Sequence, residues 1–170
     1  MKPTSILIVW HSVTGASEQL AKAAQAGALS VAADLDHPQV IDCLHCQQAG
    51  PENLLAADAY LFVCPENLAA IAGLMKDFFD RCYYPVLGAI EARAYASIVA
   101  AGSDGHNAAA QIARIATGWR LKPIREPLIT RVQAETTAQI LAPKQLNPQQ
   151  RLAAHELGAT LAAGVAMGMF

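Results

Sequence analysis

The sequence has little charge and few aromatic residues: 15% of its 170 residues are charged and 6% are aromatic. It also lacks an apolar run of the roughly 18 residues that cross a bilayer, and the best candidate, Leu157–Phe170, is too short. We therefore expect no membrane association. The formal net charge of −2 comes without a basic patch, so we expect no nucleic-acid partner either.

The four cysteines do not have the spacing of a disulfide framework. We interpret them as free thiols in a reducing cytoplasm. Met1–Thr4 leads into a strand pattern rather than a signal peptide, which agrees with this expectation. The segment Cys43-Leu44-His45-Cys46 contains one C-x-x-C pair, which leaves a zinc site short of ligands, so we expect incidental thiols and no metal. Cys64 ends a predicted strand, where a small buried residue is the usual explanation and a redox role the alternative.

Apolar strand patterns alternate with helical stretches along the chain, which predicts a parallel sheet with helices on both faces. Hydrophobic residues make up 54% of the sequence, and one domain spanning residues 1–170 is expected to bury roughly 70% of its unfolded surface. The predicted strands are Ser5–Trp10, His37–Cys43, Tyr60–Cys64, Tyr95–Ala101 and a last one divided by prolines into Arg120–Ile124 and Leu128–Thr130. The predicted helices are Ala16–Val31, Ala72–Cys82, His106–Thr117 and one that starts at Asn147-Pro148 and runs to Met167.

A hydroxyl-rich turn, Ser12-Val13-Thr14-Gly15-Ala16-Ser17, lies between the first strand and the first helix. The unpaired N–H groups and positive dipole of a helix N-terminus bind anions, and three hydroxyl groups add donors. The turn contains no lysine or arginine and matches neither the Walker loop nor the G-x-G-x-x-G fingerprint. It predicts a neutral phosphate cradle, with a simple helix N-cap as the alternative.

Distinctive loops also follow two other strands, Pro65–Gly73 after the third and Gly102–Gly105 after the fourth. Doubly wound sheets bind ligands beyond the carboxyl ends of their strands. The three loops are therefore expected to meet at one ligand.

Together these loops resemble those of flavodoxins and NAD(P)H-dependent FMN reductases, and Leu74-x-Lys76-Asp77-Phe78-Phe79-Asp80-Arg81 continues the likeness. The resemblance implies a flavodoxin-like three-layer α/β/α sandwich with a parallel sheet of about five strands in the order 2-1-3-4-5. It implies FMN as the cofactor. Its phosphate would be held by Ser12, Val13, Thr14, Gly15, Ala16 and Ser17, its isoalloxazine ring bordered by Pro65, Glu66, Asn67 and Leu68, and its pyrimidine edge by Gly102, Ser103, Asp104 and Gly105.

The sequence departs from electron-carrier flavodoxins because these loops contain no aromatic residue to stack on the ring. An open ring favours an NAD(P)H-dependent oxidoreductase that transfers hydride to the flavin and then reduces a quinone, a free flavin or a similar small acceptor. A non-enzymatic electron carrier and a flavin-free binding module are the alternatives. The resemblance does not identify a catalytic residue.

Several side chains near the loops remain open to two interpretations. His11 and His106 could contact phosphate or substrate or be polar loop residues, and Glu66 could handle a proton or face water. Lys76–Arg81 is interpreted as a salt-bridged helix face. A homodimer could cover the open ring, and its expected contacts are Leu68, Tyr83, Tyr84 and Val86–Ile90.

Overall fold

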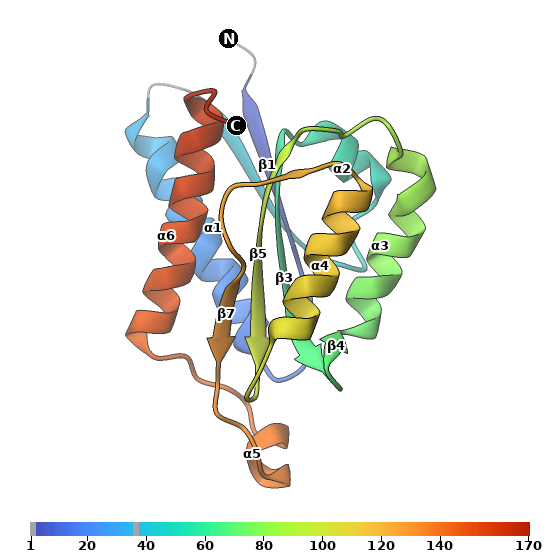
Figure 1. The fold of residues 1–170 in the computed structure, drawn as a ribbon. Helices are drawn as coiled ribbons and strands as arrows, with labels where there is room; N and C mark the ends of the chain where they lie inside the picture. The colour runs from blue at the N-terminus through green and yellow to red at the C-terminus, as the bar shows by residue number, and fades with distance from the viewer. Residues whose placement is uncertain (1–2, 36–37) are drawn as a thin grey trace.

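A parallel sheet between two layers of helices forms the core of the computed structural model, which describes residues 3–35 and 38–170 (Figure 1). The strand order is β2-β1-β3-β5, and β6 and β7 share the outer position beside β5. This confirms the flavodoxin-like order expected from the sequence. The strands are β1 (Thr4–Trp10), β2 (Gln39–His45), β3 (Ala59–Asn67), β4 (Ala70–Ile71), β5 (Ala94–Ala101), β6 (Lys122–Pro123) and β7 (Leu128–Arg131).

Alternating side chains of the central strands supply two separate hydrophobic cores, as the pleat of a strand requires. In β1, Ile6 and Ile8 belong to one core, while Leu7 and Val9 belong to the other. Helices α1 and α6 cover the first face, and α3 and α4 cover the second with α2 near its edge (Figure 1). The helices are α1 (Ala16–Asp34), α2 (Pro51–Ala56), α3 (Gly73–Val86), α4 (His106–Gly118), α5 (Thr137–Leu141) and α6 (Pro148–Ala166).

Helices α1 and α6 touch backbone to backbone at two glycines. A Cβ on Gly27 would lie 1.9 Å from the carbonyl oxygen of His155, and one on Gly158 would lie 1.9 Å from that of Ala24. Only glycine permits so close an approach. This contact fixes α6 against α1, the helix that follows the hydroxyl-rich turn.

The structure differs from the sequence-based elements mainly at the edges of the sheet. The second strand is Gln39–His45 instead of His37–Cys43, and His37 lies outside the described residues. The last position is divided between β6 and β7, as the prolines indicated, and the short antiparallel β4 was not predicted. In the two described ranges, no helix is long and apolar enough to cross a membrane.

Candidate cofactor site

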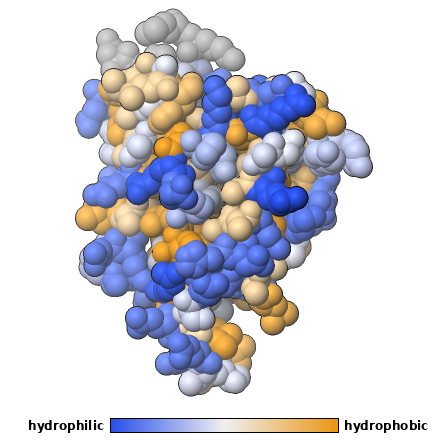
Figure 2. All heavy atoms as spheres, viewed as in Figure 1, coloured by the Kyte–Doolittle hydropathy of each residue, from blue (hydrophilic) through white to orange (hydrophobic). Residues whose placement is uncertain are grey.

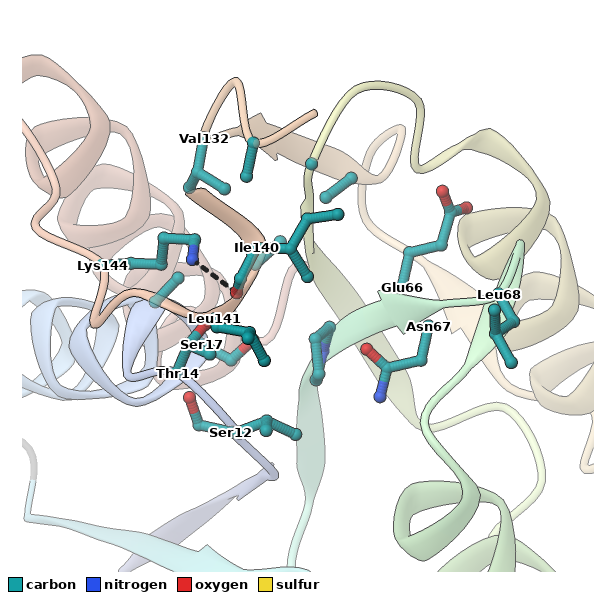
Figure 3. Close-up of a pocket in the computed structure, with 17 residues that line it drawn as sticks. Ser12, Thr14, Ser17, Glu66, Asn67, Leu68, Val132, Ile140, Leu141 and Lys144 are labelled. Carbon is teal, nitrogen blue, oxygen red and sulfur yellow. Dashed lines mark hydrogen bonds between the residues drawn. The ribbon is translucent and has the colours of Figure 1, made fainter. Parts of the chain in front are cut away.

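A cavity of about 450 Å³ lies beyond the carboxyl ends of β1, β3 and β5, within the range typical of small-molecule sites. In Figure 3 its walls come from the loop after β1, the loop after β3 and a segment near α5. Ten of the fourteen sequence-predicted residues line it; Gly15, Ser103, Asp104 and Gly105 do not. The lining residues are Ser12, Val13, Thr14, Ala16, Ser17, Pro65, Glu66, Asn67, Leu68, Ala100, Ala101, Gly102, Val132, Ala134, Ile140, Leu141 and Lys144.

The first loop, residues 12–17, turns the chain from β1 into the N-terminus of α1. Gly15 is the N-cap with φ 93°, a left-handed conformation that favours glycine, and its N–H donates to Ser12 Oγ at 3.1 Å. Ser17 Oγ is buried and has no hydrogen-bond partner. An orphaned buried hydroxyl is unfavourable by about 1–3 kcal/mol, so this atom at a cavity wall indicates a missing polar ligand.

The second loop is a tight hairpin between β3 and β4. Asn67 pairs with Ala70, and the two residues between them, Leu68 and Ala69, have φ values of 51° and 59°. Hairpin turns with two positive φ values normally use asparagine and glycine, so this turn is strained. It holds the side chain of Leu68 fully exposed at the rim of the cavity (Figure 3).

The carboxylate of Glu66 joins the second loop to the third. Its Oε1 accepts from Gly105 N at 2.9 Å and its Oε2 from Ala108 N at 3.4 Å, so Glu66 caps α4. Gly105, the N-cap with φ 90°, therefore directs its N–H to Glu66 rather than into the cavity. Only Gly102 of the third loop lines the cavity, while Ser103 and Asp104 are exposed.

A segment that sequence reasoning missed, residues 132–144, closes one side of the cavity; we call it the strap. It contains α5 and contributes Ile140 and Leu141, which supply apolar surface where the loops lack aromatic rings (Figure 3). Thr136 and Gln139 form a capping box at the start of α5, and this T-x-x-Q pattern was the available sequence signal.

Lys144 ties the strap to the first loop. Its N–H donates to the Thr14 carbonyl at 2.7 Å, and its own carbonyl accepts from Gln19 Nε2 at 2.8 Å. Its ammonium donates to the last carbonyls of α5, including Gln139 at 2.6 Å and Ala142 at 2.6 Å. Among the described lining residues Lys144 is the one cation, so the phosphate cradle expected to be neutral has an ammonium group nearby.

His11 and His106, whose roles the sequence left open, lie outside the cavity lining. His11 is buried beside His45, and burial, followed by the charge of His45, lowers the pKa of its imidazole. His106 is exposed and pairs with Asp104 at 2.6 Å, a contact that lowers the pKa of this carboxyl. Trp10 packs edge-on against His45 and does not reach the cavity.

Helix α3 carries the salt-bridged face predicted from its spacing, with Lys76–Asp80 at 2.6 Å and Arg81–Asp77 at 2.9 Å. The expected dimer contacts after it need correction. Val86, the last residue of α3, and Ile90 are buried in the chain's own core, so neither is available to a partner. Leu68, Tyr83, Tyr84 and Leu87 remain exposed.

Residues 11–135 match the family of NADPH-dependent FMN reductases. The chain belongs to this family. The match includes all three loops and confirms the resemblance seen in the sequence. Membership supports a flavin-binding oxidoreductase as the general class of function. No curated protein matches the chain.

Solved structures confirm the flavodoxin-like fold at low sequence identity. An archaeal flavodoxin has a TM-score of 0.72 at 14% identity, covering 95% of this chain and 99% of its own. A WrbA-like flavodoxin from Agrobacterium tumefaciens has a TM-score of 0.67 at 17% identity, with 97% and 98% covered. An oxidoreductase from Corynebacterium diphtheriae has a TM-score of 0.71 at 11% identity, with 96% and 97% covered.

Proposed function

We propose that this chain binds FMN in the cavity and catalyses NAD(P)H-dependent reduction of a small acceptor such as a quinone or a free flavin. The observation that carries the proposal is Ser17 Oγ, a buried hydroxyl without a partner at the N-terminus of α1. A phosphate accepts hydrogen bonds from such a hydroxyl and from the free N–H groups of the first helical turn. Membership of the reductase family agrees with this ligand.

The residues present fit FMN at both ends of the cavity. Ser12, Thr14 and Ser17 offer hydroxyl groups for the phosphate, and Lys144 lies on the same wall. The hairpin at Glu66–Leu68 would border the ring, and Gly102 leaves its opposite edge free of a side chain.

Bound FMN would supply two-electron chemistry, accepting electrons from a nicotinamide and passing them to the acceptor. The chain's own contribution would be to hold the ring and leave one side accessible. Leu68, Ile140 and Leu141 would border the ring with apolar surface but without an aromatic cover, which would leave room for a flat nicotinamide to approach. We expect the protein to work in the cytoplasm.

Titration of the flavin-free protein with FMN tests binding, with riboflavin as the matched ligand that lacks the phosphate. We expect FMN to bind with quenched or altered fluorescence and riboflavin to bind more weakly. No uptake of FMN at micromolar protein would overturn the proposal.

Under anaerobic conditions NADPH or NADH should then bleach the bound flavin, and a quinone should restore its colour. Resistance to both nicotinamides, with single-electron reduction by a separate reductase, would identify an electron carrier instead.

We further propose that a second copy of the chain covers the open ring, using exposed Leu68, Tyr83, Tyr84 and Leu87. Light scattering of the FMN-loaded protein should give a dimer at micromolar concentration. A monomer mass throughout this range would contradict the homodimer and leave FMN binding standing.

A further inference from the structure

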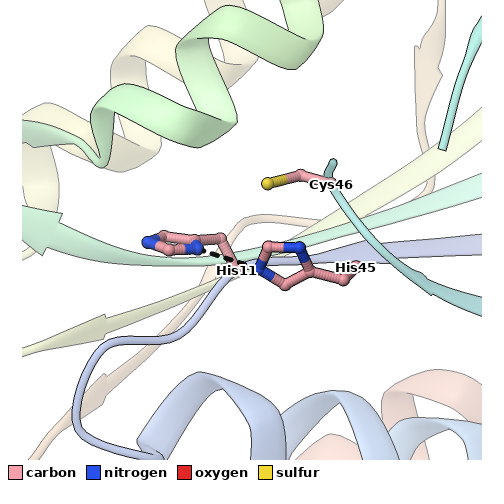
Figure 4. Close-up of side chains that lie close together, drawn as sticks. All are labelled: His11, His45 and Cys46. Carbon is pink, nitrogen blue, oxygen red and sulfur yellow. Dashed lines mark hydrogen bonds between the residues drawn. The ribbon is translucent and has the colours of Figure 1, made fainter. Parts of the chain in front are cut away.

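Three side chains with metal-binding atoms meet at the ends of β1 and β2, outside the cofactor cavity (Figure 4). His11 Nδ1 lies 3.2 Å from His45 Nε2. One ligand atom from each of His11, His45 and Cys46 lies within 4.8 Å of the other two. In Figure 4 the Cys46 sulfur lies above the two imidazole rings, which meet edge-on.

The sheet fixes the backbone of all three residues. His11 N donates to the Val63 carbonyl at 3.0 Å, and Cys46 N donates to the Trp10 carbonyl at 2.8 Å. His45 is in register with Trp10 across the β1–β2 pair. The ligands are therefore positioned by strand hydrogen bonds, and binding would require little ordering of the chain.

The ligand set and its burial suit zinc. Two imidazoles and one thiolate are ligands that Zn²⁺ prefers, and a tetrahedral site places neighbouring ligand atoms roughly 3.3–3.6 Å apart. The nitrogen separation of 3.2 Å agrees with this value, and the Cys46 sulfur, which lies within 4.8 Å of a ligand atom of each histidine, would move closer when the ion binds. His11 is 8% exposed and Cys46 is 0% exposed, so two of the three ligands are shielded from bulk water.

Zinc binding would change the protonation of His45 and Cys46. Gln47 N donates to His45 Nδ1 at 3.3 Å, which favours the His45 tautomer whose ring proton is on Nε2, the atom 3.2 Å from His11 Nδ1. Ligation through His45 Nε2 would move the ring proton to Nδ1. The long and weak hydrogen bond from Gln47 N to His45 Nδ1 would then be lost. The thiol of Cys46 releases its proton to solvent, because the thiolate is the ligand.

A cation lies beside Cys46. Arg81 donates from its guanidinium to the carbonyl oxygens of Cys46 and Ala49. Its positive charge favours a thiolate ligand at Cys46 over a neutral thiol.

We propose that His11, His45 and Cys46 bind one Zn²⁺, with a fourth position open to water. Among the residues that the structure describes, this group has three members, as expected of a site with one open position. The ion would join the ends of β1 and β2 directly below the first loop. Its binding does not depend on the flavin.

Calorimetric titration of the full-length, chelator-treated protein with Zn²⁺ tests the site. We expect a stoichiometry of about one, with about one proton released when the titration is repeated in buffers of different ionisation enthalpy. Cys46→Ser and His45→Gln should each weaken binding by at least about a hundredfold, since even outer-shell changes at zinc sites weaken it by 10–100-fold. X-ray absorption at the zinc edge should detect one sulfur and two nitrogen neighbours from the chain.

Cys43→Ser and His106→Gln are matched controls, because neither residue belongs to the cluster. Both should bind Zn²⁺ like the unchanged protein. Circular dichroism of Cys46→Ser shows whether the fold is intact and keeps this test separate from the flavin proposal. Absence of Zn²⁺ binding, or equal binding by Cys46→Ser and the unchanged protein, would overturn the zinc site.

Discussion

Glu66 Oε1 accepts a 2.9 Å hydrogen bond from Gly105 N and so joins the loop after β3 to the start of α4. Gly105 is the N-cap residue and has no side chain to cap its own helix. A carboxylate from a neighbouring strand replaces the usual capping side chain, and its negative charge interacts favourably with the positive end of the helix dipole. The two loops therefore hold each other in place.

Replacing Glu66 with alanine should remove this cap and lower the free energy of unfolding by about 0.5–2 kcal/mol, the range for N-cap losses. Urea denaturation measures the change. Glu66→Gln retains an oxygen acceptor and should recover part of the loss. If Glu66→Ala leaves stability unchanged, the contact with Gly105 does not support α4.

Ser17→Ala separates ligand binding from stability, because the hydroxyl has no partner in the protein alone. Removing an unsatisfied buried hydroxyl should raise the stability of the flavin-free protein by roughly 1 kcal/mol. A hydrogen bond to a charged group contributes about 1.5–3 kcal/mol, so FMN affinity should fall about tenfold or more. Riboflavin affinity should barely change, and equal losses for both ligands would exclude a phosphate contact at Ser17.

Lys144→Met should loosen the strap and weaken the binding of FMN more than the binding of riboflavin. The variant keeps the length and apolar stem of the side chain but loses the ammonium that binds the α5 carbonyls. Limited proteolysis should cut residues 132–144 faster in this variant, and FMN should slow the cleavage. Lys76→Met, which removes an exposed ammonium group outside the cavity lining, serves as the control.

The strained hairpin offers a stabilising change. Leu68→Asn combined with Ala69→Gly introduces the Asn-Gly pair favoured where both central residues have positive φ. We expect a higher melting temperature, corresponding to about 1 kcal/mol or more, since each strained residue costs about 1–3 kcal/mol. A lower melting temperature would show that contacts of the Leu68 side chain outweigh the turn strain.

The buried thiols predict a loss of stability in alkali. Burial raises the pKa of Cys43 and Cys82 from 9.0 to about 11 and that of Cys64 to about 12. Above the ordinary value the unfolded chain loses these protons first, so the folded state binds more protons and stability falls as pH rises from about 9 to about 11. Urea midpoints at about pH 8 and pH 10.5 measure the fall, and Cys64→Ala should reduce it. A pH-independent midpoint would contradict the raised values.

The sequence predicts the central fold well, because local patterns and global structure agree there. The continuous apolar run of β1 and the breaks after Trp10 and Ala101 are local signals for buried parallel strands and ligand loops. The sequence did not predict the strap or the β4 hairpin, because their positions depend on distant contacts such as the hydrogen bond from Lys144 N to Thr14 O. A turn of leucine and alanine gives no turn signal.

The histidine pair illustrates the same limit for a functional cluster. His11 and His45 are separated by 34 positions and meet only through the pairing of β1 with β2. The segment Cys43-Leu44-His45-Cys46 contains two members of the cluster, but Cys43 packs against the α1–α6 core. The third member, His11, follows the neighbouring strand, so spacing along the chain gives no sign that it lies close to His45 and Cys46.

The backbone contact between α1 and α6 at Gly27 and Gly158 has a consequence for biosynthesis. The strap runs directly into α6, whose N-cap is Asn147, and α6 is held in place by α1. While α6 is still inside the ribosomal tunnel, α1 packs on the sheet without its α6 contact, and the strap lacks a fixed second end. The strap side of the cavity is therefore completed only after α6 has left the tunnel and packed against α1, so closure of the cavity belongs to a late stage of folding.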